Sequence, residues 1–355
     1  MTQSHKSVTM VELFYDLIFA YAVGRMAQAL ALPTHGFIAP RMLGEFLMML
    51  LVFWVIWTYQ TVLANRYFNN QLAQSLFTLF NMFWVIVLST AINVDFVKTK
   101  WSFQLSTAIL FLSVAIQYGL IWRQKHAALP KIFGLTLTIA GALALVSPFL
   151  TPYSLSFTFF FLGVVGASFV PLLFWRTINA APVDFSHLSE RYSLLVLLIF
   201  GEAVIGVADT VYSGLSLQAG LFFFVVILLF VAYQLVYDNG LNRQIKTGGL
   251  AAIHLHYPLL AAILSISTFI HLWLTQELDP RWFAAAITLA LAVYYFSLIG
   301  YLRAYPTSKI DIGFKRWFYL GFSLMIFGVY SFMTAAMPLP FMLCLLYTSP
   351  SPRDA

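Results

Sequence analysis

Long apolar runs separated by short polar segments dominate the chain. Each run has about 20 residues, which is the length that a helix needs to cross the hydrocarbon core of a bilayer. Within lipid the backbone must satisfy its own hydrogen bonds, and an α-helix does so inside one segment. The pattern therefore predicts an all-α polytopic bundle of about eleven membrane-spanning helices, at 11–31, 42–64, 70–92, 101–122, 132–150, 154–175, 190–212, 218–237, 251–274, 281–302 and 312–334.

The composition narrows the class of protein further. Hydrophobic residues make up 61% of the 355 positions and charged residues 9%, against about 25% charged in soluble domains. This excludes a soluble enzyme, a disordered chain and a nucleic-acid-binding module. Cys344 is the single cysteine, so an internal disulfide and a cysteine-based metal site are excluded as well. We expect the lipid bilayer as a partner and no cofactor.

The distribution of basic residues predicts the orientation. If helices begin alternately on the two sides, thirteen Lys and Arg residues flank the side that carries the N-terminus and five flank the other. Cytoplasmic loops carry the excess of Lys and Arg, so we expect a cytoplasmic N-terminus. Glu12 and Asp16 interrupt the first apolar run and no small-residue cleavage site follows, so we expect this run to be retained.

We expect one integral membrane domain over 1–343, followed by a tail at 344–355 that resembles a translated library adapter and that we interpret as non-native. Two segments, TYQTVLANR at 58–66 and AYQLVYDNGLNR at 232–243, share Tyr-Gln and Asn-Arg pairs. They suggest two parallel repeat halves, about 8–175 and 184–335, as in some transporters. In that arrangement Arg66 and Arg243 are equivalent.

Charged residues inside the apolar runs are costly and therefore mark candidate sites. Glu12 and Asp16 are four residues apart and share a helix face. Two carboxylates this close do not both ionise easily unless a cation is near. Arg66, which ends the second helix on the same side, is a candidate cation.

The segment 187–209 carries the densest polar signal. The helical period places His187, Arg191 and Glu202 on one stripe, with Glu202 about 16 Å beyond Arg191 and close to the bilayer midplane. An unpaired acid there would be protonated at rest and would suit a proton carrier; a structural hydrogen bond across the bundle is the equal alternative. Glu190 points to another face and could cap the helix start.

His254 and His256 open a further helix, two positions apart and thus on different faces. They could relay protons at the cytoplasmic mouth or bond to headgroups and loops. We expect no metal site, because the spacing of His187 and Glu190 has no second such pair. Nine candidate site residues share the cytoplasmic depth and Glu202 lies deeper, so the pattern favours a polar vestibule that leads to a buried acid. The ten candidate site residues are Glu12, Asp16, Arg66, His187, Glu190, Arg191, Glu202, Arg243, His254 and His256.

Four stretches resemble the bacterial low temperature requirement protein A (LtrA) family: VELFYDLIFAYAV at 11–23, LANRYF at 63–68, HLSERYSLLVLLIFGEAV at 187–204 and HLHYPLL at 254–260. Departures from the family pattern are Tyr15 and Tyr192 in place of Phe, Ser193 in place of Gly, and Phe68 in place of an acid. The resemblance implies a multi-pass protein of the bacterial cytoplasmic membrane with a link to growth in the cold. It implies no settled molecular activity.

Our leading hypothesis is a secondary transporter or exchanger of a small solute, with proton coupling as one form of it. A membrane sensor or scaffold linked to cold growth is the first alternative. A membrane-embedded lipid-modifying enzyme is the second, although the sequence carries no HExxH, GxGD or aspartate-rich diphosphate motif. The oligomeric state is left open.

Overall fold

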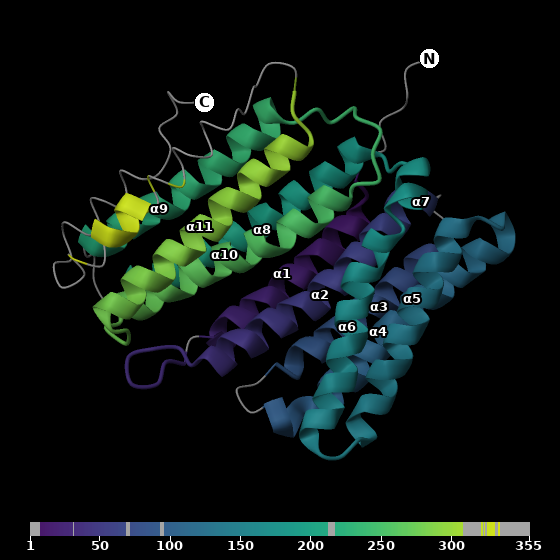
Figure 1. Ribbon diagram of the computed structural model, residues 1–355, viewed down its shortest axis with the longest axis horizontal. Coiled ribbons are helices and arrows are strands. Elements are labelled where there is room, and N and C mark those ends of the chain that lie inside the picture. The colour runs from purple at the N-terminus through teal and green to yellow at the C-terminus, as the bar shows by residue number, and fades with distance from the viewer. Residues whose placement is uncertain are drawn as a thin grey trace. The chain divides into compact units, whose positions relative to one another are not determined.

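A computed structural model describes residues 8–30, 32–68, 72–92, 96–211 and 217–307, together with 321, 323, 325–330 and 333. These residues are mainly helical (Figure 1). The elements are α1 (Met10–Leu30), α2 (Pro40–Tyr67), α3 (Leu72–Thr90), α4 (Phe96–Lys125), α5 (Ala128–Val146), η1 (Ser147–Phe149), α6 (Tyr153–Leu173), α7 (Trp175–Ala180), α8 (Phe185–Val211), α9 (Leu217–Leu235), η2 (Val236–Gly240), α10 (Leu250–Leu274) and α11 (Pro280–Ala304).

The all-α prediction is confirmed, and most predicted helices lie within a few residues of their observed bounds. The predicted helix at 312–334 falls largely outside the described residues. The predicted start at residue 190 was wrong by five positions, because α8 begins at Phe185. The short helix α7 and the π-helical turn η2 were not predicted. Eight helices of the described chain are long and apolar enough to cross a membrane: α2, α3, α4, α5, α6, α9, α10 and α11.

The described residues fall into two compact units. Unit 1 is drawn from Met1–Ala29, Gly44–Leu195 and Gln244–Ile253, and unit 2 from Leu30–Leu43, Val196–Arg243 and His254–Ala355. Neither unit corresponds to one of the predicted repeat halves, and the repeat remains a prediction.

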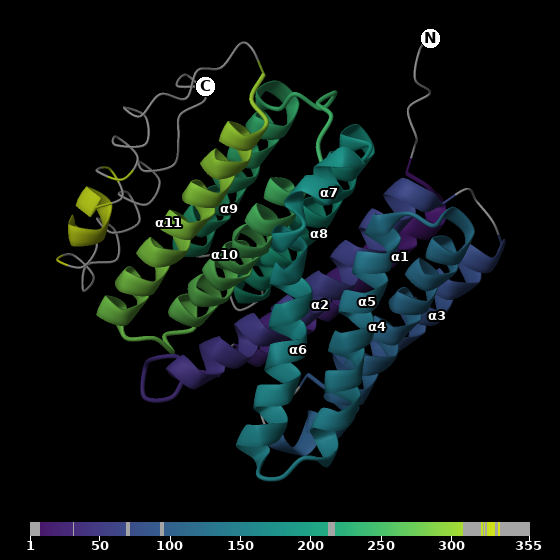
Figure 2. The same ribbon diagram turned by 45° about the vertical axis from the view of Figure 1, so that its right-hand side comes forward.

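In unit 1, α4, α5 and α6 run side by side, as both Figure 1 and Figure 2 show. Small residues allow this close approach: a Cβ atom added at Gly163 of α6 would lie 3.0 Å from the Ala140 carbonyl oxygen of α5. Two buried tyrosines hold α2 against this group. The Tyr59 hydroxyl donates to the Ala167 carbonyl of α6 at 2.9 Å, and the Tyr118 hydroxyl of α4 donates to the Tyr59 carbonyl at 3.0 Å.

In unit 2, α9, α10 and α11 lie side by side in both views. The Tyr294 hydroxyl of α11 donates to the Leu229 carbonyl of α9. Asp279 caps α11, since its carboxylate accepts hydrogen bonds from the backbone N–H groups of Arg281 and Trp282 at 2.9 Å.

Candidate functional site

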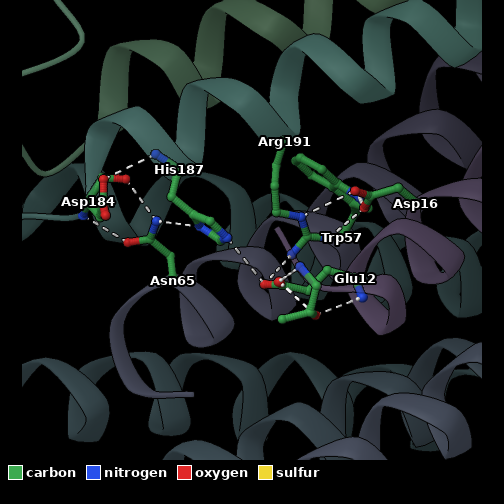
Figure 3. Close-up of polar contacts among 8 residues, drawn as sticks. Glu12, Asp16, Trp57, Asn65, Asp184, His187 and Arg191 are labelled. Carbon is green, nitrogen blue, oxygen red and sulfur yellow. Dashed lines mark hydrogen bonds and ion pairs between the residues drawn. The ribbon is translucent and has the colours of Figure 1, made fainter. Parts of the chain in front are cut away.

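An ion pair between α1 and α8 lies at the centre of the polar cluster in unit 1 (Figure 3). Asp16 and Arg191 are almost fully buried, at 0% and 1% exposure. Arg191 donates to both carboxylate oxygens of Asp16, with Nε 3.2 Å from Oδ2 and Nη2 bonded to Oδ1. The bidentate geometry is the strong form of this interaction.

Trp57 of α2 completes the surroundings of the pair. Its indole Nε1–H donates to Asp16 Oδ1 at 2.7 Å, and the Arg191 guanidinium lies 5.4 Å from its ring centroid. A buried carboxylate is tolerated when its charge is paired and its lone pairs accept hydrogen bonds. Asp16 meets both conditions, so the pair is a fixed part of the fold.

Glu12 lies one helical turn before Asp16 and is held on only one of its oxygens. Its Oε2 accepts from the Thr9 backbone N–H at 2.9 Å and from the Thr9 hydroxyl at 3.0 Å. Its Oε1 is buried and has no hydrogen-bond partner among the described residues. Arg191 Nη1 and His187 Nε2 both lie 3.6 Å from Oε1, too far for a hydrogen bond.

Asn65, near the end of α2, determines which nitrogen of His187 carries a proton. The Asn65 Oδ1 atom accepts from the Asp184 backbone N–H at 3.0 Å, and its Nδ2 donates to the Asp184 carbonyl at 2.9 Å. These two contacts fix the orientation of the amide. Its second N–H therefore points at His187 Nδ1, 3.1 Å away, which makes Nδ1 an acceptor. In the neutral imidazole the proton then sits on Nε2, facing Glu12.

Asp184 also caps α8. Its Oδ1 accepts from the His187 backbone N–H at 3.1 Å, which is the N-cap contact that helix starts prefer. The cap explains why α8 begins five residues before the predicted start. It also places His187 in the first turn, beside Asn65 (Figure 3).

A pocket of about 260 Å³ adjoins the cluster. Its lining comes from the start of α1, the end of α2, the start of α3 and Arg191 of α8; the lining residues are Thr9, Val11, Glu12, Tyr15, Gln60, Ala64, Phe68, Gln74, Ser75, Thr78 and Arg191. The Tyr15 hydroxyl is buried without a hydrogen-bond partner among the described residues, as is Glu12 Oε1. Two of the lining residues therefore each carry a buried polar atom that forms no hydrogen bond with the described residues.

A buried amide network continues from the pocket through Gln60. The Gln60 side chain donates to the Thr78 hydroxyl at 3.4 Å, and its Oε1 accepts from Asn81 at 3.2 Å and from Gln117 at 3.4 Å. Ser113 donates to Asn81 Oδ1 at 2.6 Å. These uncharged groups connect α2, α3 and α4.

Comparison with known proteins now adds to this geometry. Residues 7–349 match the family described as Bacterial low temperature requirement A protein (LtrA). The chain belongs to the LtrA family. No curated protein and no solved structure gave a match. This LtrA protein is thus a multi-pass helical membrane protein of a bacterial family.

The structure brings together four of the ten predicted site residues of the LtrA protein: Glu12, Asp16, His187 and Arg191. Arg191 is the cation beside the two acids, so the suggestion of Arg66 for that place was wrong. Arg66 belongs to the same unit, where its Nη2 donates to the Gly248 carbonyl at 3.5 Å. Glu190 is half-buried and is the sixth residue of α8, so it does not cap the helix.

The other four predicted residues belong to unit 2. Glu202 is half-buried and has no hydrogen bond or ion pair with a described residue. His256 is fully buried, with Nε2 3.2 Å from the Tyr233 hydroxyl. His254 is half-buried, and the Arg243 guanidinium lies 4.8 Å from the Tyr237 ring centroid. The described residues hold no group of three or more His, Cys, Asp or Glu side chains that could bind a metal.

Sequence reasoning missed the residues that orient the cluster: Trp57, Asn65 and Asp184. For Asp184 a signal existed, because an aspartate just before a helical apolar pattern is a typical N-cap residue. For Trp57 no such signal existed, since a tryptophan in an apolar run is most simply interpreted as a core residue.

Proposed function

We propose that this LtrA protein is a secondary transporter of a small polar solute, coupled to protons, in which Glu12 is the group that gains and loses the proton. The observation that carries the proposal is the Glu12 carboxyl in the pocket wall, which is buried and has one oxygen that accepts no hydrogen bond from a described residue. Buried acids of this kind in membrane proteins are typical of proton relays.

The neighbouring charges support a division of roles. Arg191 is committed to Asp16 through two hydrogen bonds, so this pair positions the site and does not exchange its proton. Glu12 lines the pocket, and its Oε1 lies 3.6 Å from Arg191 Nη1 and from His187 Nε2. A proton arriving through the pocket therefore meets Glu12 first.

Glu202 is proposed as a second proton acceptor. Its half-buried carboxyl lies in the middle of α8, and it has no partner in the described part of the chain. We also propose the bacterial cytoplasmic membrane as the location, with the N-terminus in the cytoplasm, from the excess of basic residues on that side.

The test uses the full chain in proteoliposomes that contain a pH-sensitive dye. A panel of small cations, neutral polyols and carboxylates is added outside, and solute-dependent proton movement is recorded. We expect movement with one class, a loss of at least tenfold in Glu12→Gln, and wild-type rates in the control Glu277→Gln, an exposed acid of the α10–α11 connection. Rates equal to those of protein-free liposomes with every solute would contradict transport. A wild-type rate in Glu202→Gln would remove the role proposed for that residue.

A further inference from the structure

The end of unit 1 at which α4 finishes and α5 begins is strongly basic. Arg123 and Lys125 lie in the last turn of α4 and Lys131 in the first turn of α5, and all three are exposed. Arg176 of α7 is exposed as well, and α7 lies against α5. Arg123, Lys125, Lys131 and Arg176 together form what we call the basic end of unit 1.

No acid of the surrounding helices balances this charge. The sequence holds no Asp or Glu between Asp95 and Asp184, so α4, α5, α6 and α7 carry no carboxylate side chain. None of the four residues of the basic end forms an ion pair with a described residue. Their positive charge is therefore available to an anion from outside the chain.

Aromatic rings hold two of these cations in place. Lys125 Nζ lies 5.2 Å from the ring centroid of Tyr67, at the end of α2. Lys131 Nζ lies 5.3 Å from the ring centroid of Trp122 on α4. The face of a ring attracts a cation but does not neutralise its charge, and an ammonium group has three N–H donors. Both lysines thus have a defined position and can still donate hydrogen bonds to an anion.

The tryptophans of α4 place the basic end at the level of lipid headgroups. Trp101 and Trp122 are 44% and 37% exposed, and tryptophan is enriched at both interfaces of a membrane. The two residues are 21 positions apart, or about 32 Å along a helix, which matches the roughly 30 Å of the hydrocarbon core. Arg123 and Lys125 follow directly after Trp122 and therefore lie just outside the core.

We propose that the basic end of unit 1 binds the headgroup of an anionic phospholipid, whose phosphate oxygens accept hydrogen bonds from Lys125 and Lys131. Basic residues that lie next to a membrane-spanning helix are attracted to anionic lipids, and each Lys or Arg adds to the attraction. This site is separate from the pocket beside Glu12 and does not depend on the proposed transport.

The surface next to the basic end favours a lipid over a soluble anion. Toward the middle of the membrane, Leu120 and Ile116 of α4 are 45% and 55% exposed, and Leu135 and Ile139 of α5 are 57% and 53% exposed. Acyl chains that continue from a headgroup at the basic end would cover these apolar side chains. A soluble phosphate would leave them uncovered and gain only the electrostatic attraction.

The test is a displacement assay on the full chain in a neutral detergent, with a phosphatidylglycerol that carries a fluorescent acyl chain as the bound probe. The competitors are unlabelled phosphatidylglycerol, phosphatidylcholine with the same acyl chains, and glycerol 3-phosphate. We expect phosphatidylglycerol to displace the probe at a concentration at least tenfold lower than phosphatidylcholine does, and glycerol 3-phosphate not to displace it. Raising the salt from about 0.05 M to about 0.5 M should reduce this preference, because salt screens exposed charges.

Two outcomes of this assay would overturn the proposal. Equal displacement by the two lipids at low salt would show that the charge of the headgroup is not recognised. Displacement by glycerol 3-phosphate at the concentrations at which phosphatidylglycerol acts would assign the site to soluble phosphates.

Variants locate the site. Lys125→Gln with Lys131→Gln should reduce the preference for phosphatidylglycerol at least fivefold, whereas Lys125→Arg with Lys131→Arg should keep it because both charges remain. The control, Lys98→Gln with Lys100→Gln, removes the same charge near the opposite end of α4 and should bind as the wild type does. A preference that persists in Lys125→Gln with Lys131→Gln, or that the control loses to the same extent, would contradict a site at the basic end. The salt dependence of the wild type tests the electrostatic basis without any variant.

Discussion

At the scale of single residues, the two acids of α1 have different surroundings although they lie one turn apart. Asp16 receives two hydrogen bonds from Arg191 and one from Trp57. Glu12 receives its hydrogen bonds on one oxygen, from Thr9, and its other oxygen lies 3.6 Å from Arg191 and His187. The first arrangement surrounds Asp16 with hydrogen-bond donors, and the second leaves Glu12 Oε1 with ion-pair partners but no hydrogen bond from a described residue.

The buried pair should be costly to break from one side. Arg191→Leu leaves the Asp16 carboxylate buried without a cation, and we expect the free energy of unfolding to fall by about 3–5 kcal/mol. The double variant Asp16→Leu with Arg191→Leu should lose less than the sum of the single losses, because neither member of the pair is left buried without the other. Unfolding in mixed detergent micelles measures both, and additive losses would show that the two residues do not act as a pair.

Asn65 should control the tautomer of His187. In the wild type, ¹⁵N NMR of histidine-labelled protein should show Nδ1 without a proton and Nε2 with one, because Asn65 donates to Nδ1. Asn65→Asp replaces that donor by an acceptor, so Nδ1 should gain a proton. The exposed His126 is an internal control whose signals should not change. A protonated Nδ1 in the wild type would contradict the assigned orientation of the Asn65 amide.

At the scale of helices, spacing and hydropathy predict the elements but not which faces meet. Arg66 and Arg191 have the same predicted depth, and nothing in the sequence separates them as partners for Asp16. The choice depends on the rotation of α2 and α8 about their axes, which tertiary packing sets. The start of α8 depends on the contact between Asp184 and His187, which an apolar-run criterion does not register. The sequence does predict that four polar residues share one depth, because each lies near the same end of an apolar run. These are Glu12, Asp16, His187 and Arg191.

The contact between α5 and α6 should not tolerate added volume. In Gly163→Ala the new Cβ would lie 3.0 Å from the Ala140 carbonyl oxygen and 3.2 Å from Leu143 Cβ, so the helices must move apart. Overpacking of this kind costs about 1–3 kcal/mol. Gly166→Ala is the matched control on the same helix, because its Cβ would meet nothing within 4 Å. Thermal unfolding in detergent should separate the two variants, and equal melting temperatures would contradict the close packing.

At the scale of the whole molecule, the strong regularities are the apolar runs and the unequal distribution of basic residues. The runs determine that the described chain is helical and crosses a membrane several times. The division of the chain between two units was not predictable, because segments distant in sequence, such as Gln244–Ile253 and Met1–Ala29, join the same unit. Hydropathy carries no information on such long-range association.

The proposed cytoplasmic N-terminus gives a further prediction. The predicted alternation of helices puts thirteen basic residues on the side of the N-terminus and five on the other. A cysteine that replaces His126, on the N-terminal side, should be inaccessible to a membrane-impermeant thiol reagent in intact cells and reactive after lysis. The exposed Glu277, replaced by cysteine, should react in intact cells. Both are made with Cys344→Ser as background. The opposite labelling pattern would place the N-terminus outside.

If the protein is the transporter proposed above, the double hydrogen bond between Asn65 and the Asp184 backbone limits how a solute can reach Glu12. It ties the end of α2 to the start of α8, and the contacts of Arg191 tie α8 to α1. Of the helices around the pocket, α3 is joined to the others at this end by weaker, uncharged contacts such as the 3.4 Å bond between Gln60 and Thr78. Displacing α3 would therefore break uncharged hydrogen bonds and no ion pair among the described residues. We expect the passage between the aqueous phase and the Glu12 carboxyl to run along α3.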